Sequence, residues 1–303
     1  MSQAPNPALD PEVAQRVAGL MLRARRAADG ALSGLHRSPQ HGTSAVFAEH
    51  RPYRPGDDLR LLDWRAYART DRHSVKRFDQ EAHLRVRLVL DRSASMHWTG
   101  PSGGSTKLEH AATLLAGLAY VLFRQGDAVG LSVIDEELRN HLATRARPAH
   151  LQALLDELIQ PAVQGSATRL ASTLEAVGER IGRRGVLVLA SDLLDDDPNA
   201  LQPLAHLVTR GHDVIVLHVL HPDELVLPFE EGAVVEGLEG EPSIESDGRE
   251  VKEAYQAEIA RFLEDSRKRC LSIGARYALC RSDEAPERTL ASILGAAAKK
   301  GWH

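Results

Sequence analysis

An aspartate and two serines follow one apolar segment at alternate positions. Asp91-Arg92-Ser93-Ala94-Ser95 begins where the predicted strand 84–91, LRVRLVLD, ends. In open α/β sheets, ligands bind at the carboxyl ends of the strands. One carboxylate and two hydroxyls at positions i, i+2 and i+4 can converge there on a hard cation, and such oxygen ligands suit Mg²⁺ or Mn²⁺ rather than zinc. The spacing therefore predicts an all-oxygen metal site.

Two more oxygen donors are expected from neighbouring loops at the same sheet edge. Thr168 lies in the loop Gly-Ser-Ala-Thr before a predicted helix, and Asp192 ends the apolar strand VLVLAS, with Ser191 beside it as a supporting residue. The alternative is a strand-end turn in which serine and aspartate cap helices. The run Asp195 to Asp197 is interpreted as a solvated acidic loop with a helix cap near Pro198.

The elements that must position these residues alternate between strand and helix from Leu84 onward, which is typical of a parallel α/β sheet. We predict six strands, at 84–91, 127–135, 138–143, 185–194, 213–220 and 275–281. We predict helices at 107–124, 150–159, 170–183, 199–210, 249–271 and 289–300, and an inserted hairpin at about 225–248. Residues 1–83 are expected to form an extension, with a helix from Asp10 to about Ala28 followed by a β-rich module, and residues 84–303 the main domain.

Composition bounds the class of protein. The chain has 303 residues, of which 43% are apolar and 26% charged, and a net charge of −5 from 37 basic and 42 acidic residues. These values are ordinary for a globular protein, and the mild acidity argues against nucleic-acid binding. Two cysteines, the lack of a signal-peptide pattern and the absence of an apolar run of about 18 residues favour a cytoplasmic protein without direct membrane insertion.

Two other segments invite a functional interpretation. The glycine-rich stretch 100–107 ends in Ser-Thr-Lys, whereas a phosphate-binding loop requires Gly-Lys-Ser/Thr. We therefore expect a flexible rim beside the metal, with Ser105 or Thr106 capping the following helix. The charged stretch 51–64, RPYRPGDDLRLLDW, is interpreted as an internal ion-pair lattice, with partner docking as the alternative.

The motif resembles the metal-ion-dependent adhesion site of von Willebrand factor A domains. The resemblance rests on D-R-S-A-S at 91–95, on Thr168 and on A-S-D at 190–192. It implies a three-layer, Rossmann-like fold with a mostly parallel central sheet. It also implies that Ser93, Ser95 and Thr168 coordinate the metal directly, that Asp91 and Asp192 act mainly through water, and that a partner's carboxylate takes the open position.

A second resemblance covers nearly the whole chain after residue 9. The stretch 51–64, the sequence D-R-S-A-S-M after the first buried strand, and K-L-E at 107–109 are similar to the bacterial family called domain of unknown function 58. This family is linked with MoxR-type AAA+ ATPases. The resemblance implies an accessory or adaptor role in the assembly or maturation of client complexes, without enzymatic activity.

The expected function is therefore non-enzymatic recognition of an acidic side chain through Mg²⁺. The alternative is a metal-dependent hydrolase, phosphatase-like, that uses the same ion as a Lewis acid, with Lys107 or Arg92 as the only candidate phosphate-binding groups. A third possibility is a structural scaffold that binds through residues 31–83.

Overall fold

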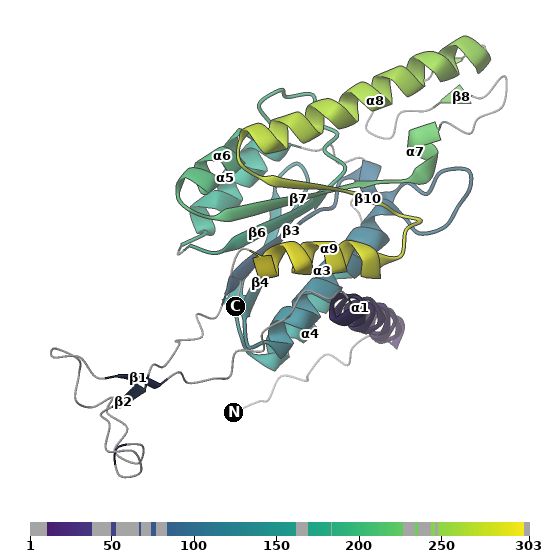
Figure 1. Cartoon of the computed structure of the whole chain (residues 1–303). Helices are drawn as coiled ribbons and strands as arrows, with labels where there is room; N and C mark the ends of the chain where they lie inside the picture. The colour runs from purple at the N-terminus through teal and green to yellow at the C-terminus, as the bar shows by residue number, and fades with distance from the viewer. Residues whose placement is uncertain are drawn as a thin grey trace, which may run out of the picture.

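A six-stranded sheet with helices on both faces forms the centre of the molecule (Figure 1). Its strands are β3 Arg85–Asp91, β4 Ala128–Ile134, β5 Leu138–Arg145, β6 Val186–Ser191, β7 Asp213–Leu220 and β10 Arg276–Arg281. They lie in the order β10-β7-β6-β3-β4-β5, and all neighbours are parallel except β4 and β5. This computed structural model describes residues 11–37, 50–52, 67, 74–76, 84–161, 169–182, 184–226, 234–235, 244–245 and 248–299. The predicted three-layer α/β fold with a mostly parallel central sheet is confirmed.

The helices divide between the two faces of the sheet. One face is covered by α3 Lys107–Arg124, α4 Pro148–Leu158 and α9 Pro286–Lys299, and the other by α5 Leu170–Arg180, α6 Gln202–Thr209 and α8 Gly248–Ser272. The first helix, α1 Pro11–Arg37, packs against α3 and α9. Short elements are η2 Ala94–His97 and α7 Pro222–Val226, with the antiparallel pairs β1 His50–Pro52 with β2 Ser74–Lys76 and β8 Val234–Val235 with β9 Ile244–Glu245.

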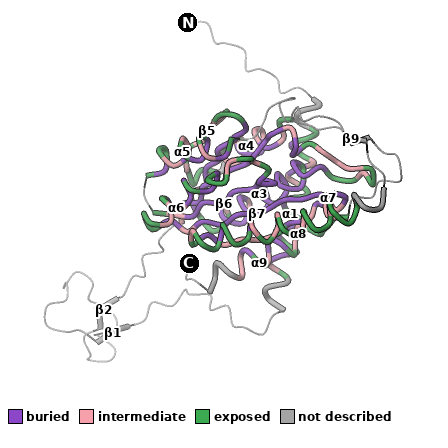
Figure 2. Tube along the Cα trace, turned by 90° about the horizontal axis from the view of Figure 1, so that it is seen from above, coloured by how far each residue is buried: buried purple, intermediate pink, exposed green. Residues whose placement is uncertain are grey.

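The central strands are buried on both faces, as Figure 2 shows. Every residue of β6 is buried, so its near-continuous apolar sequence is what two helical layers require. Successive side chains of β3 point to opposite layers. Leu88 and Leu90 join the cluster with α3, whereas Val89 joins the cluster with α5 and α6. The sheet therefore presents its carboxyl-terminal edge, and not a face, to any ligand.

Helix α1 is longer and better packed than expected. The residues 31–37, expected to begin a β-rich module, continue the helix. Small residues make this possible, because Ala24, Ala27 and Ala31 are fully or almost fully buried in the cluster with α3. A Cβ at Gly117 of α3 would lie 2.7 Å from a methyl group of Leu290 and 3.4 Å from the Ala24 carbonyl oxygen, so a larger residue there would require the Leu290 side chain to shift. The helix therefore contributes to the main core, although it precedes the expected boundary at residue 83.

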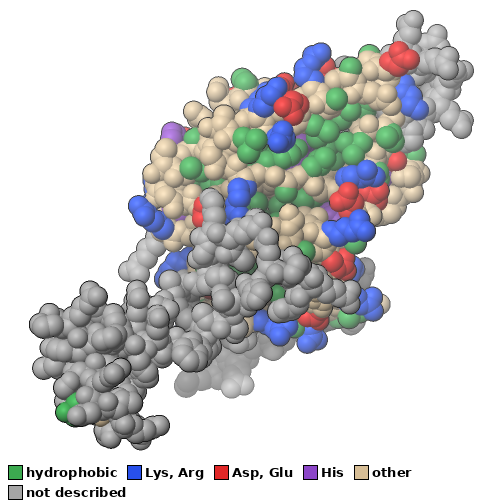
Figure 3. Space-filling view, in the orientation of Figure 1, with side chains coloured by type: hydrophobic (Ala, Val, Ile, Leu, Met, Phe, Trp, Pro, Cys, Tyr) green, Lys and Arg blue, Asp and Glu red, His purple; other side chains and the backbone are tan. Residues whose placement is uncertain are grey.

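The visible surface is charged along the helices and apolar over the edge strand. In Figure 3, hydrophobic side chains gather over β10, between the charged positions of α8 and α9. Leu279 of this strand is 39% exposed. Within the described part of the chain, no helix is long and apolar enough to cross a membrane.

The packing of α1 can be tested by comparing two leucines on the same helix. Leu20 is 1% exposed and belongs to the core, whereas Leu22 is 52% exposed. Leu20→Ala should lower the free energy of unfolding by about 2–4 kcal/mol, because it leaves a cavity in a packed cluster. Leu22→Ala should change it by less than about 0.5 kcal/mol. Urea unfolding measures both, and equal effects would show that α1 does not share the core.

Candidate metal centre

The predicted metal-binding motif forms a tight turn between β3 and η2. Asp91 is the last residue of β3 and is fully buried. Its Oδ1 accepts a hydrogen bond from the backbone N–H of Ser93 at 3.0 Å, and the hydroxyls of Ser93 and Ser95 lie 3.1 Å apart. An aspartate that bonds the backbone two residues later stabilises such a turn. The turn thereby brings one carboxylate and two hydroxyls into the same buried region.

The end of the adjacent strand β6 supplies the second carboxylate. The Ser191 hydroxyl donates to Asp91 Oδ2 at 2.6 Å and accepts from the backbone N–H of Leu193 at 2.9 Å. Leu193 has φ of +56°, in the left-handed region that is costly for a side chain with a Cβ. Asp192, between them, is fully buried. Ser191 thus joins the two strand ends, in the supporting position expected for it.

The electrostatics of this edge are unfavourable without a cation. Burial, followed by the negative charge of Asp192, raises the pKa of Asp91 to about 7, although hydrogen bonds from Ser191 and Ser93 oppose the shift. Among the described residues, Asp91 has no cationic partner. A buried carboxylate without a partner is expensive to ionise, so this group either holds a proton or requires a positive ion.

Lys107 provides a positive charge on the other side of Asp192. It is the first residue of α3 and is fully buried. Its Nζ donates to Asp192 Oδ2 at 2.8 Å and to Glu224 Oε1 at 2.5 Å. Burial lowers the pKa of Lys107, but the charges of the two carboxylates outweigh that effect and raise it overall, so the amine is an ammonium. Lys107 was expected to matter as a candidate phosphate-binding group of the hydrolase alternative, and Glu224 was not expected at this site. The sequence feature that could have indicated a buried ion pair is a lysine at the start of a mostly apolar helix.

The segment that carries Glu224 also fixes the glycine-rich loop, which was expected to be flexible. Asp223 Oδ2 accepts from the backbone N–H of Ser102 at 2.8 Å and from its hydroxyl at 2.7 Å. The Nε2 atom of His221 lies 3.1 Å from the carbonyl oxygen of Gly103. Gly100 has φ of +65°, and a Cβ there would lie 2.3 Å from Asp223 Oδ2. The expectation of a flexible rim is therefore wrong, because buried polar groups of a distant segment hold the loop.

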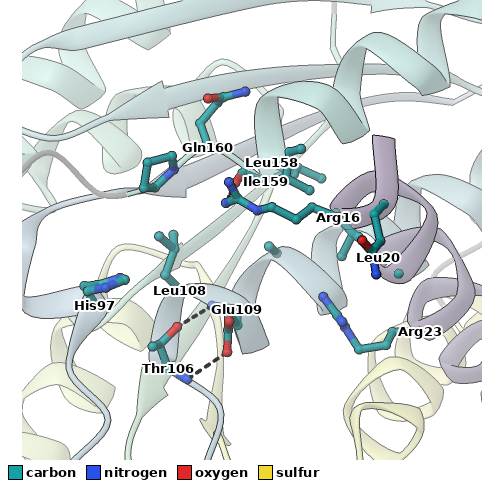
Figure 4. A pocket seen from close by; sticks show the side chains of 14 residues that line it. Arg16, Leu20, Arg23, His97, Thr106, Leu108, Glu109, Leu158, Ile159 and Gln160 are labelled. Atoms are coloured by element: carbon teal, nitrogen blue, oxygen red, sulfur yellow. Dashed lines mark hydrogen bonds between the residues drawn. The ribbon is translucent and has the colours of Figure 1, made fainter. Parts of the chain in front are cut away.

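The cap at the start of α3 is as predicted. Thr106 and Glu109 form a reciprocal capping box, drawn in Figure 4. Around this cap lies a pocket of about 350 Å³ between α1, η2, α3 and the end of α4, with Arg16, Arg23 and His97 in its lining. His97 follows Ser95 by two residues, so the pocket adjoins the metal-binding turn along the chain.

His218 fixes the backbone of Asp192. Its Nε2 lies 2.8 Å from the Asp192 carbonyl oxygen, and its Nδ1 lies 2.8 Å from the Tyr277 hydroxyl. Because a carbonyl oxygen can only accept, Nε2 carries the proton and Nδ1 accepts from the tyrosine. Burial lowers the pKa of His218 to about 4, so the ring is neutral near pH 7. His218 lies within β7, and its role here is structural support.

Thr168 lies outside the described residues, but the two residues that follow it are placed. The backbone N–H of Arg169 donates to the Asp135 carbonyl oxygen at 3.2 Å, at the end of β4. The backbone N–H of Leu170 donates to Asp195 Oδ2 at 2.7 Å. Asp195 therefore binds the first turn of α5, which corrects its interpretation as part of a solvated acidic loop. Both bonds lie at the same sheet edge as Asp91.

The donor set decides which ion could fit. Within the described ranges, no group of three or more His, Cys, Asp or Glu side chains could hold a metal ion. A site here would therefore depend on serine and threonine hydroxyls and on water, together with the buried strand-end carboxylates Asp91 and Asp192. Hard cations such as Mg²⁺ accept such ligands and keep several waters. The residues present fit that class of ion, with Asp91, Ser93 and Ser95 as the group that the structure brings together.

Comparisons with known proteins identify the family through one family model and otherwise show only which proteins this chain is similar to. An uncharacterized protein of Mycobacterium bovis is 27% identical over 264 residues, which cover 84% of this chain and 82% of that protein. The structure of conserved hypothetical protein BatB from Bacteroides thetaiotaomicron is 17% identical, with a TM-score of 0.48 over 71% of this chain and 99% of that one. The VWA domain of SpRpn10 is 8% identical, with a TM-score of 0.38 over 68% of this chain and 93% of that domain. The family model described as protein of unknown function DUF58 matches residues 49–265. Because this match spans most of the chain, including the Asp91 turn and the Lys107 helix, the protein belongs to the DUF58 family.

Proposed function

We propose that this protein is a non-enzymatic, metal-dependent protein-interaction module. Mg²⁺, or Mn²⁺, at the ends of β3 and β6 recruits an acidic side chain of a partner protein. One observation carries the proposal: Asp91 is a fully buried carboxylate with no cationic partner among the described residues, and two serine hydroxyls lie beside it. A divalent ion at this point would remove the cost of its charge.

Each residue of the proposed site has a distinct role in binding the ion. Asp91, Ser93 and Ser95 would hold the ion, and Asp192 would face it from β6. Thr168 is the proposed fifth ligand, supported by the anchoring of Arg169 and Leu170 at the same edge of the sheet. When bound, the ion supplies a Lewis-acidic position for a carboxylate oxygen. Few charged ligands come from the protein, so an anionic ligand from a partner is favoured.

The partner class follows from the family resemblance. We propose a MoxR-type AAA+ ATPase, or a client of such an ATPase, as the protein that offers the acidic side chain. The chain would then act as an adaptor in assembly or maturation of client complexes. The anchored loop 98–106 supports this role, since a fixed surface beside the ion favours selective recognition.

The geometry fits recognition better than the hydrolase alternative. A phosphatase needs a cationic group free to bind phosphate, but Lys107 is fully buried and engaged by two carboxylates. Arg92 is 7% exposed and lies 3.1 Å from Glu157 in an ion pair. One oxygen of Asp91 accepts the Ser191 hydroxyl, which hinders its use as a nucleophile.

Replacement of Asp91 should separate metal binding from folding. Asp91→Asn removes the charge that attracts the ion but keeps the shape of the turn. We expect loss of the Mg²⁺-dependent rise in melting temperature, and loss of Mg²⁺-dependent capture of the MoxR-type ATPase in a pulldown. Asp196→Asn is the matched control, because Asp196 is an exposed aspartate in the nearby loop after β6. Capture that survives in EDTA and in Asp91→Asn would contradict the metal-bridged mechanism.

The pH dependence of stability should carry the signature of Asp91. Its pKa of about 7 in the fold lies above the ordinary value of 3.8, so the folded state holds a proton that the unfolded chain releases. Without metal, this contribution to stability is fully present below about pH 4 and is lost as pH rises through about 7. Urea unfolding in EDTA at pH 5 to 8 should show a decline for the native protein that is weaker for Asp91→Asn. Mg²⁺ should reduce the decline, and identical pH profiles for the two proteins would rule out Asp91 as its source.

A further inference from the structure

Lys107 lies at the centre of a charge cluster that the proposed metal site does not explain. Lysines are almost never fully buried unless they are paired. Here the ammonium bridges two carboxylates that lie far apart in sequence, Asp192 after β6 and Glu224 on α7. The first of these carboxylates faces the proposed metal site, so the ammonium and the metal ion would share it.

The ion pair with Lys107 limits how strongly the carboxylate of Asp192 can bind a metal ion. Its Oδ2 accepts from Lys107 at 2.8 Å, and its Oδ1 accepts from the backbone N–H of Leu194 at 3.3 Å. Oδ1 is thus the less strongly engaged oxygen. The nearby ammonium also opposes the approach of any further cation, because like charges repel strongly where little water screens them.

Lys107 cannot easily move away from this position. Glu224, its second acceptor, is itself held by the backbone N–H of His221, which donates to Oε2 at 2.7 Å. The hydroxyl of Tyr255 on α8 donates to the Glu224 carbonyl oxygen at 2.7 Å. Lys107 is fully buried and directly follows Thr106, the N-cap residue of α3. The positive charge is therefore a permanent part of the site.

We propose that Lys107 is a positioning residue that sets the affinity of the metal site. It fixes Asp192 through Oδ2, and its charge weakens the binding of the divalent ion by the protein alone. Tight binding of the ion then depends on the carboxylate of a partner, which restores the missing negative charge. This inference rests on the proposed function, because it presumes that a divalent ion binds beside Asp91.

The test is calorimetric titration of the full chain with Mn²⁺ alone. Lys107→Met by itself would leave Glu224 buried and unpaired, so the informative variant combines Lys107→Met with Glu224→Gln. This double variant frees Asp192 for the metal, and we expect Mn²⁺ to bind about tenfold more tightly than to the native protein. Glu224→Gln alone leaves the ammonium to act on Asp192 only, and Mn²⁺ should bind more weakly. Lys268→Met, an exposed lysine on α8, should leave the affinity unchanged.

The outcomes separate this inference from the proposed function. Native protein that binds Mn²⁺, with equal or weaker binding by the double variant, overturns the role of Lys107 and leaves the metal site standing. Absence of Mn²⁺ binding by both the native protein and the double variant overturns both. If the double variant does not fold, the Glu224→Gln variant provides the test. Unchanged or tighter binding of Mn²⁺ by that variant contradicts the proposed role of Lys107. A second readout is the melting temperature, which Mn²⁺ should raise more in the double variant than in the native protein.

Discussion

Two fully buried aspartates at adjacent strand ends are the constraint around which this edge of the sheet is organised. Asp91 and Asp192 cannot both be ionised cheaply at such a place, since both are fully buried and each repels the other. The ammonium of Lys107 compensates the negative charge of Asp192. For Asp91 it provides hydroxyl donors but, among the described residues, no cation. This asymmetry is what a divalent ion would resolve.

The surrounding hydrogen bonds hold Asp91 and Asp192 in place. Ser191 joins the ends of β3 and β6, and His218 holds the backbone of Asp192 from β7. The segment after β7 holds Lys107 through Glu224 and the glycine-rich loop through Asp223. Polar groups that are satisfied in this way are rigid, and a rigid edge is a good basis for selective binding. A site of this kind needs little rearrangement to accept an ion or a partner.

Much of this fold could be predicted from the sequence because its strongest patterns are local. The apolar run of β7 and the capped apolar helix α3 were predicted with the bounds that the structure has. The length of α1 was missed, since its buried alanines give a weaker signal than leucines would. The contacts of Lys107 with Asp192 and Glu224 span 85 and 117 residues. No local pattern encodes such pairings, and the same holds for Asp223 and the loop that it anchors.

The most direct test of the central claim is a crystal structure of the protein soaked in Mn²⁺, with anomalous scattering used to locate the ion. The account predicts one anomalous peak at the end of β3, within bonding distance of the hydroxyl oxygens of Ser93 and Ser95, with Lys107 still bonded to Asp192. No peak at that position in crystals of the native protein, with the hydroxyls of Ser93 and Ser95 still bonded to each other, would contradict it.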